Sequence, residues 1–339
     1  MKNVPNLTYK KALDYTIYLR NHEAKDDDQF NFIQVETCEP FPMLVTSTAI
    51  RQYRKRISQH ISYKTLPINC RNTYANNMRF FRATGIDKGK SFDEDYGNSN
   101  YLPITRLDIN RLREEGIANY DQIQVIIEKK ADDMALVLSR GSKTLKKLLK
   151  YTFTEIMRNV PEHSNADSIW YCAQYWPTKD FVELAFIDEG IGIKNSLLTN
   201  YAYTQIIDSD QKALEYAIKP GVSSSFAPGS QNMDKSEWAN SGFGLYMISN
   251  LCAELGGDFT LASGETALKV SKNTYTGQIQ HTFNRCCIDG TAIRITVKPS
   301  SINSYENVAR QILKNGEALA KADGKSIHFA SMSTKKILE

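Results

Sequence analysis

The chain has 339 residues, of which 42 are Lys or Arg and 38 are Asp or Glu, so its formal net charge is only +4. That balance excludes a histone-like or polybasic nucleic-acid binder as the default interpretation, because binding driven by counterion release needs clustered positive charge. With 41% hydrophobic and 24% charged residues, the composition is that of an ordinary folded soluble protein. At ~150 residues per domain, the length predicts about two domains.

The N-terminus and the cysteines predict a cytoplasmic protein. The first residues, MKNVPNLTYKKALDY, lack the apolar core of a signal peptide. No segment approaches the ~18 to 20 apolar residues that cross a bilayer. The six cysteines are scattered and form no C-x-x-C pair, which argues against a disulfide framework or a zinc cage. We therefore expect reduced thiols and no membrane contact.

Residues 1–115 predict a small α/β domain. Alternating apolar residues at 30–35 predict a strand, and the helix-like stretch after it carries the basic run RQYRKR at 51–56. INCRN at 68–72 predicts a second short strand, YANNMRFFRATG at 74–85 an amphipathic helix, and the polar segment 87–101 a loop or domain edge. The basic run leaves nucleic-acid binding open, although such runs more often form solvated helix faces.

Residues 116–300 predict a larger α+β domain. Helical periodicity over 121–150 leads into a helix at 152–163, strands at 168–176 and 181–188, a helix at 244–255, and strands at 257–263 and 291–299. This order predicts a two-layer sandwich with helices on one face of a mostly antiparallel sheet. Residues 194–241 form a long polar connection within it, and 301–339 predict a C-terminal helix and tail.

Three polar residues share one helix face in the second domain. Glu155, Asn159 and His163 are four apart, so their side chains stack on one side of the helix. Such a stripe is usually a solvated face, but Phe153 and Ile156 place an apolar stripe beside it. A carboxylate and a carboxamide there can orient a water molecule and ligate a hard cation.

Two further short segments carry candidate chemistry at strand ends. Asp188-Glu189-Gly190-Ile191-Gly192 directly follows an apolar strand, and Gly290-Thr291 enters the last strand. A rim carboxylate is suited to accept a hydrogen bond from an exocyclic amine such as that of adenine, and the glycines allow a flat ligand to approach. Taken alone, the first segment is a tight turn and the threonine a structural strand residue.

A third segment, Ser241-Gly242-Phe243-Gly244-Leu245, immediately precedes a helix. Small residues at a helix N-terminus expose backbone N–H groups that favour phosphate oxygens. The segment is neither a Walker A loop nor a complete Rossmann fingerprint.

The order and spacing of these segments resemble the GHKL ATP-binding superfamily, which includes gyrase B, heat-shock chaperones, MutL, histidine kinases and anti-sigma-factor kinases. Glu155 and Asn159 resemble the N box, DEGIGI the G1 box, SGFGL the G2 box and Gly290-Thr291 the closing element. The resemblance covers roughly residues 145–298 and implies the Bergerat α/β sandwich, with residues 194–241 as the ATP lid.

The resemblance also implies roles for the site residues. Asp188 would receive the adenine amine, assisted by Thr291 through water. Asn159 would hold Mg²⁺ on the phosphates, and Glu155 would be the general base or, in kinase members, assist transfer to a protein side chain. The other implied nucleotide contacts are Gly190, Gly192, Ser241, Gly242, Phe243, Gly244, Leu245 and His163. Glu162 departs from the lysine of many histidine kinases, which removes one phosphate contact.

Three functions stay open from the residues. The first is a Mg²⁺-dependent, slow ATPase whose lid closure switches contact with a protein partner or with a second protomer of a homodimer. The second is a protein serine/threonine kinase of the anti-sigma-factor type, and the third is an ATP-binding regulatory module without turnover. Neither His22 nor His60 lies in an H-box pattern, which disfavours autophosphorylation in cis. The N-terminal region weakly resembles STAS-like domains.

Overall fold

The structure is a computed structural model that describes residues 1–25, 28–56, 72–86, 100–224, 242–323 and 335. Most of the strand expected at 68–72 and of the loop expected at 87–101 lies outside the described residues, as does His60. Within the described ranges, no helix is both long and apolar enough to span a membrane.

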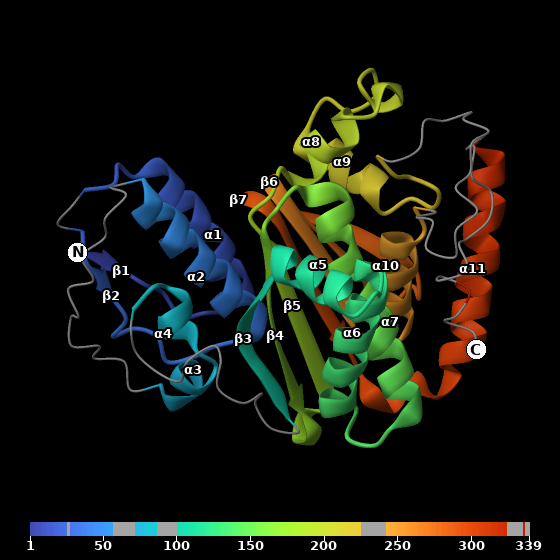
Figure 1. The fold of residues 1–339 in the computed structure, drawn as a ribbon, viewed down its shortest axis with the longest axis horizontal. Helices are drawn as coiled ribbons and strands as arrows, with labels where there is room; N and C mark the ends of the chain where they lie inside the picture. Colours follow the sequence, from blue (N-terminus) through green and yellow to red (C-terminus); the bar gives the residue numbers. More distant parts are fainter. Residues whose placement is uncertain (26–27, 57–71, 87–99, 225–241, 324–334, 336–339) are drawn as a thin grey trace.

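A five-stranded antiparallel sheet forms the centre of the molecule (Figure 1), with strand order β3-β4-β5-β7-β6. The strands are β3 (Tyr101–Asp108), β4 (Ser168–Trp176), β5 (Phe181–Asp188), β6 (Asp258–Lys272) and β7 (Ile279–Val297). The predicted α+β class is confirmed, as are the strands at 168–176 and 181–188. The last two strands are longer than expected, and β3 was not predicted because Pro103 interrupts its apolar pattern.

One face of the sheet is covered by helices that follow β3 in the chain. They are α5 (Ile109–Ala118), α6 (Ile123–Ser139), α7 (Lys143–Asn159), α9 (Asp210–Ala217), α10 (Gly244–Glu254) and, outside α10, α11 (Tyr305–Ala322). Alternate residues of β4, namely Ile169, Tyr171 and Ala173, belong to the core beneath these helices. The helical periodicity expected over 121–150 corresponds to α6 and to the first half of α7, which continues into the helix expected at 152–163.

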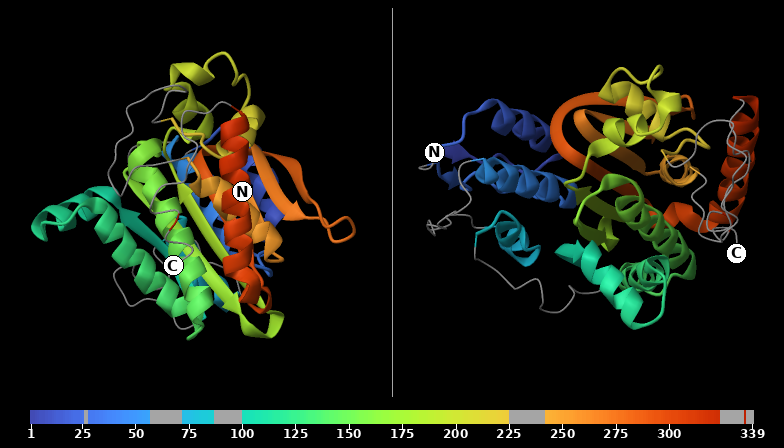
Figure 2. Two further views of the ribbon diagram at one scale, coloured as in Figure 1. Left: turned by 90° about the vertical axis from the view of Figure 1, so that its right-hand side faces the viewer. Right: turned by 45° about the horizontal axis from the view of Figure 1, so that its top comes forward.

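The opposite face of the sheet is covered by the N-terminal residues, which corrects the expectation of helices on one face only. α1 (Tyr9–Asn21) packs on β7, and α2 (Pro40–Lys55) packs on β4 and β5 (Figures 1 and 2). Trp170 and Cys172, the other residues of β4, join the core of this layer. Strands buried on both faces read as nearly continuous apolar runs, as SIWYCAQYW does.

The N-terminal elements are shorter than expected. A two-stranded parallel sheet pairs β1 (Lys2–Asn3) with β2 (Phe30–Asn31), so the strand expected at 30–35 ends early. The single helix expected at 74–85 is two short ones, α3 (Thr73–Asn77) and α4 (Phe80–Ala83), separated by Arg79 in the left-handed region at φ 59°. The boundary expected near residue 115 stays a prediction, but β3 precedes it and belongs to the main sheet.

The connection expected to be polar and irregular over 194–241 contains regular structure. It begins inside α8 (Gly192–Leu198) and holds a 3₁₀ turn at Tyr201–Tyr203 and α9. Ser209 caps α9 by accepting a hydrogen bond from the Lys212 N–H at 3.3 Å. Residues 225–241 of the expected lid lie outside the described residues.

A buried ion network joins α2 to three strands of the sheet. The Glu183 carboxylate of β5 accepts the backbone N–H of Phe41, in the first turn of α2, at 2.9 Å. Its other oxygen accepts from Arg294 of β7 at 2.8 Å, and Arg294 also donates to Asp258 at 3.0 Å. A carboxylate at a helix N-terminus is favourable, so Glu183 fixes the start of α2 on the sheet.

We expect Arg294→Met to destabilise the fold by about 3–5 kcal/mol, because it leaves the fully buried Glu183 carboxylate without its cation. Lys269→Met is the matched control, since Lys269 pairs with the same Asp258 at 3.2 Å from a more exposed position. Urea unfolding followed by circular dichroism measures both variants. Equal losses in the two would show that the buried pair has no special role.

Candidate nucleotide-binding site

One cavity opens between α7, the ends of β5 and β7, α8 and the start of α10. It holds about 870 Å³ of space free of atoms, part of it open to solvent, which suits a ligand of nucleotide size. Nine of the residues singled out from the sequence line it: Glu155, Asn159, His163, Asp188, Gly192, Gly242, Gly244, Leu245 and Thr291. Residues from four distant parts of the chain therefore meet in one place.

The Asp188 carboxylate lies at the end of β5, where the sheet register places it opposite Thr291 of β7. Asp188 is only 6% exposed, and its Oδ1 accepts the Gly190 N–H at 2.9 Å. Burial raises the pKa of Asp188 to about 7, the neighbouring Glu189 adds to the rise, and hydrogen bonds from the backbone of Gly190 and Thr291 oppose it. A strong hydrogen-bond donor in the cavity would favour the ionised form.

The Glu155 carboxylate approaches the cavity from α7. Its Oε1 is buried and has no hydrogen-bond partner within the described part of the chain. Burial raises the pKa of Glu155 to about 7, and the positive charge of Arg158 opposes the rise. A buried acceptor without a partner is costly, so this oxygen is available to a ligand, a water molecule or a cation.

Arg158 is a buried cation of this region that the motif reading missed. Its guanidinium lies 4.0 Å from Glu155 and 3.2 Å from Glu162. Glu162, which replaces the lysine of many histidine kinases, is thus held by Arg158. The spacing of 155, 158 and 162, three and four residues apart on a helix, is the sequence signal that could have indicated the arrangement.

His163 lies in a π-helical turn (Val160–Ser164) that follows α7. Its Nδ1 is 3.0 Å from the Ser224 hydroxyl, and burial lowers the pKa of the imidazole. His163 is therefore neutral at physiological pH and joins the α7 side of the cavity to the chain after α9. Single π-helical turns often mark functional sites.

The first turn of α10 faces the Glu155 side chain. A Cβ atom placed on Gly244 would stand 2.5 Å from Glu155 Oε2, so glycine permits the close approach of helix and carboxylate. Gly242 has φ +70°, and a Cβ there would lie 2.5 Å from the backbone oxygen of Val222. The Gly221 N–H donates to the Gly242 carbonyl at 3.1 Å, which brings the two chain segments together.

Two of the described residues that were expected at the site, Gly190 and Phe243, do not line the cavity. Gly190 lies behind Asp188, where a Cβ would overlap the Ser164 carbonyl. Phe243 is fully buried in the hydrophobic core, with its ring centroid 6.3 Å from that of Tyr246. Phe243 is therefore a packing residue that holds the start of α10, and Ser241 lies outside the described residues.

Comparison with known proteins identifies the class of this domain. Residues 144–301 match the family described as histidine kinase-, DNA gyrase B-, and HSP90-like ATPase. This part of the chain is therefore a GHKL-type ATP-binding domain, as its motifs indicated. No curated protein and no solved structure matches the chain. The STAS-like resemblance of the N-terminal region stays a prediction.

We expect Gly242→Ala to destabilise the protein by about 2–4 kcal/mol and to weaken nucleotide binding, because the new methyl group meets both an unfavourable φ and the Val222 backbone. Gly277→Ala is the matched control, with φ +69° and nothing within 4 Å of the added carbon, and should cost only about 1 kcal/mol. Thermal unfolding and calorimetry with ATP compare the two. Similar effects of both substitutions would exclude a steric role for Gly242.

Proposed function

We propose that this protein is a Mg²⁺-dependent ATP-binding protein and a slow ATPase. The observation that carries the proposal is the meeting of the Asp188 carboxylate, the Glu155–Asn159 face of α7 and the start of α10 in one cavity. The ATP-binding family of residues 144–301 supports the nucleotide as ligand. Hydrolysis, the metal and the residue roles are the parts that experiment must test.

Asp188 is proposed to bind the adenine amine. An ionised carboxylate has acceptor oxygens only, and an exocyclic amine offers the N–H donor that such an oxygen needs. Thr291, opposite Asp188 in the register, supplies a hydroxyl beside it. Leu261 and Ile293 give the same cavity an apolar wall on which a flat ring packs.

The phosphates are proposed to lie between α7 and the N-terminus of α10. Backbone N–H groups at the start of α10 and the helix dipole favour anionic oxygens there. The carboxamide oxygen of Asn159 is a hard donor of the kind that Mg²⁺ prefers, and Asn159 lines the cavity, so this residue fits the ion. When bound, Mg²⁺ would offset negative charge on the phosphates.

Glu155 is proposed as the general base. A carboxylate whose pKa lies near 7 can hold the proton of an attacking water at physiological pH, and its position beside Gly244 brings it to the proposed phosphate end of the site. In its ionised form it accepts that proton, and Arg158 behind it stabilises the negative charge.

Regulation is proposed to run through the segment that carries α8 and α9. Ser196 of α8 and Ser224 line the cavity, so ATP would contact this segment directly and alter its contact with a protein partner or with a second protomer. We further propose that the protein acts in the cytoplasm. Incubation with γ-labelled ATP separates the functions: free phosphate indicates an ATPase, label on a partner a kinase, and intact ATP a regulatory module.

Asp188→Asn should weaken ATP binding by about 30- to 100-fold, because the amide replaces a charged acceptor. The same change should stabilise the free protein at pH 8 by about 2–4 kcal/mol. The folded-state pKa of about 7 lies above the usual 3.8, so the stability that the protonated form gives is fully present below about pH 4 and is lost as pH rises from there to about 7. At pH 5 the difference in stability between the two proteins should therefore be clearly smaller than at pH 8.

Calorimetry with ATP and thermal unfolding at pH 5 and pH 8 measure both effects. Asp180→Asn, at the other end of β5, is the control and should leave ATP binding unchanged. Unaltered ATP affinity in Asp188→Asn would contradict the assignment of adenine to this carboxylate.

Glu155→Ala should keep ATP affinity within about threefold and reduce turnover by about 100- to 1,000-fold, because it removes the base and leaves the adenine end intact. In the unchanged protein, turnover should rise with pH through about 7, where Glu155 loses its proton. Phosphate release and calorimetry separate the two effects. Glu254→Ala, a surface carboxylate at the end of α10 paired with Lys272, is the control. Equal loss of affinity in Glu155→Ala and Asp188→Asn would contradict the roles assigned to both.

A further inference from the structure

The basic run of α2 faces the G1 segment of the ATP-binding domain. Arg51 and Lys55 hold the two carboxylate oxygens of Glu189, at 2.7 Å and 3.0 Å. Arg51 is also fixed by the Trp170 ring of β4, 4.0 Å from its guanidinium, and donates to the Ala83 carbonyl at 2.8 Å. The run that left nucleic-acid binding open therefore supplies cations to the residue next to Asp188.

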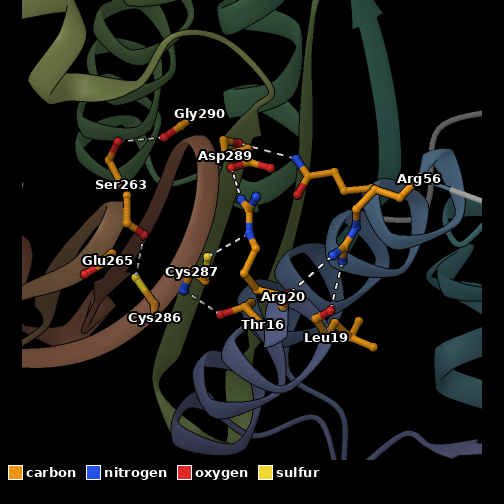
Figure 3. A network of polar contacts seen from close by, with 12 residues as sticks. Thr16, Leu19, Arg20, Arg56, Ser263, Glu265, Cys286, Cys287, Asp289 and Gly290 are labelled. Atoms are coloured by element: carbon orange, nitrogen blue, oxygen red, sulfur yellow. Dashed lines mark hydrogen bonds and ion pairs between the residues drawn. The ribbon is translucent and has the colours of Figure 1, made fainter. Parts of the chain in front are cut away.

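α1 and α2 also hold the segment that leads to Thr291. Arg20 of α1 pairs with Asp289 and donates to the sulfur of Cys287 at 3.1 Å (Figure 3). The buried Thr16 hydroxyl accepts the Cys287 N–H at 2.8 Å, and Gln52 of α2 donates to the Asp289 carbonyl at 3.4 Å. Thr291 lies two residues beyond this contact.

The segment after Asp188 and the segment before Thr291, both contacted by the N-terminal helices, meet at the cavity. Asp188 and Thr291 are paired across β5 and β7, and a Cβ on Gly290 would overlap the Asp188 carbonyl. The Gly290 carbonyl accepts from the Ser263 hydroxyl at 2.7 Å, and that hydroxyl accepts the Ile193 N–H at 3.0 Å, which extends the contact to α8. A displacement of α1 and α2 would thus move both Asp188 and Thr291 at the proposed adenine end.

We propose that the N-terminal α1–α2 layer controls nucleotide affinity, with Arg51 and Glu189 as positioning residues: Arg51 draws the Glu189 carboxylate out of the site and neutralises it, so that Asp188 can carry the charge that adenine requires. The proposal rests on the proposed ATP site. It assigns to the first 56 residues a function within this site, and it makes any partner that moves α2 a regulator of ATP binding.

The charges around Asp188 support this coupling. Although burial favours the neutral acid, Arg51 and Lys55 hold the pKa of Glu189 below its usual value, so Glu189 is ionised at neutral pH. Its negative charge in turn raises the pKa of Asp188. The other ionisable groups nearby are Glu155 and His163 across the cavity and Arg106 of β3, which acts on Arg51.

Removal of Arg51 and removal of Glu189 should therefore shift the pKa of Asp188 in opposite directions. In Arg51→Met, the Glu189 charge is only partly neutralised by the exposed Lys55, and the pKa of Asp188 should rise. In Glu189→Gln, the like charge is gone and the pKa should fall. A pair that served only to hold the layers together would lower stability in both variants without this reversal of sign.

The test is the affinity for ADP, measured by calorimetry between pH 6 and pH 9, in Arg51→Met, Glu189→Gln and the double variant. The pH below which half of the affinity is lost should rise by ~1 unit in Arg51→Met, with about fivefold weaker binding at pH 7. It should fall in Glu189→Gln, and the double variant should return toward the unchanged protein. Arg54→Met is the control on the same helix, because Arg54 donates to Thr84 within the N-terminal layer.

A second measurement keeps the proposal testable without nucleotide. The Asp188 carboxyl carbon, identified by its loss in Asp188→Asn, is titrated by NMR in the same variants, with Lys55→Met added in case Arg51→Met does not fold. If the pKa of Asp188 shifts in the same direction in Arg51→Met and Glu189→Gln, or does not shift, while the unchanged protein binds ADP, the inference is overturned and the proposed function is not. Failure of the unchanged protein to bind ADP would overturn the proposed function, and with it the inference.

Discussion

A carboxylate at the end of a strand that is buried on both faces is the constraint on which this structure depends. β5 is covered by α2 on one side and lies above the core of α7 and α10 on the other, so Asp188 has little access to water. The two backbone N–H groups that reach it offset only part of the lost hydration. The free protein is therefore less stable than it could be, and a ligand that donates to Asp188 recovers that free energy. We propose that this recovered free energy contributes to the affinity for the amine-bearing ring of adenine.

The same double cover explains why the N-terminal residues reach the rim of the site. Without α1 and α2, the face of the sheet formed by Trp170, Cys172 and Ala185 would be open to water. The layer that covers this face carries Arg20 and Arg51, which form ion pairs with Asp289 and Glu189 at the ends of β7 and β5 that border the site. The Glu183–Arg294 network fixes the start of α2 on the sheet, so its C-terminal basic residues face a defined point. Packing and site electrostatics are thus consequences of one arrangement.

Much of the ATP-binding domain could be predicted because its chemistry lies at the ends of short apolar segments. Asp188 follows the strand at 181–188, and Gly244 begins the helix at 244–255, so local patterns place both. The partner of a buried strand face is not a local property: the apolar residues of β4 indicate burial on two sides but not by which element. Arg51 and Glu189 are 138 residues apart, and no spacing rule connects them. The ring of Phe243 is a related case, since its position in the motif says nothing of the core contact that the ring makes.

The cavity contains two carboxylates whose pKa values lie near 7 for the same reason, burial. In the proposed function they serve opposite ends of a nucleotide, so both must be ionised, one to accept a donor from the base and one to accept a proton from water. Binding of the adenine end to Asp188 would stabilise the charge there and leave Glu155 to titrate in the complex. The pH dependence of kcat should then report Glu155 alone, whereas that of kcat/KM reports both groups of the free protein. The separation of the two profiles follows from the geometry, because the two carboxylates are carried by α7 and β5 and only β5 is in contact with the N-terminal layer.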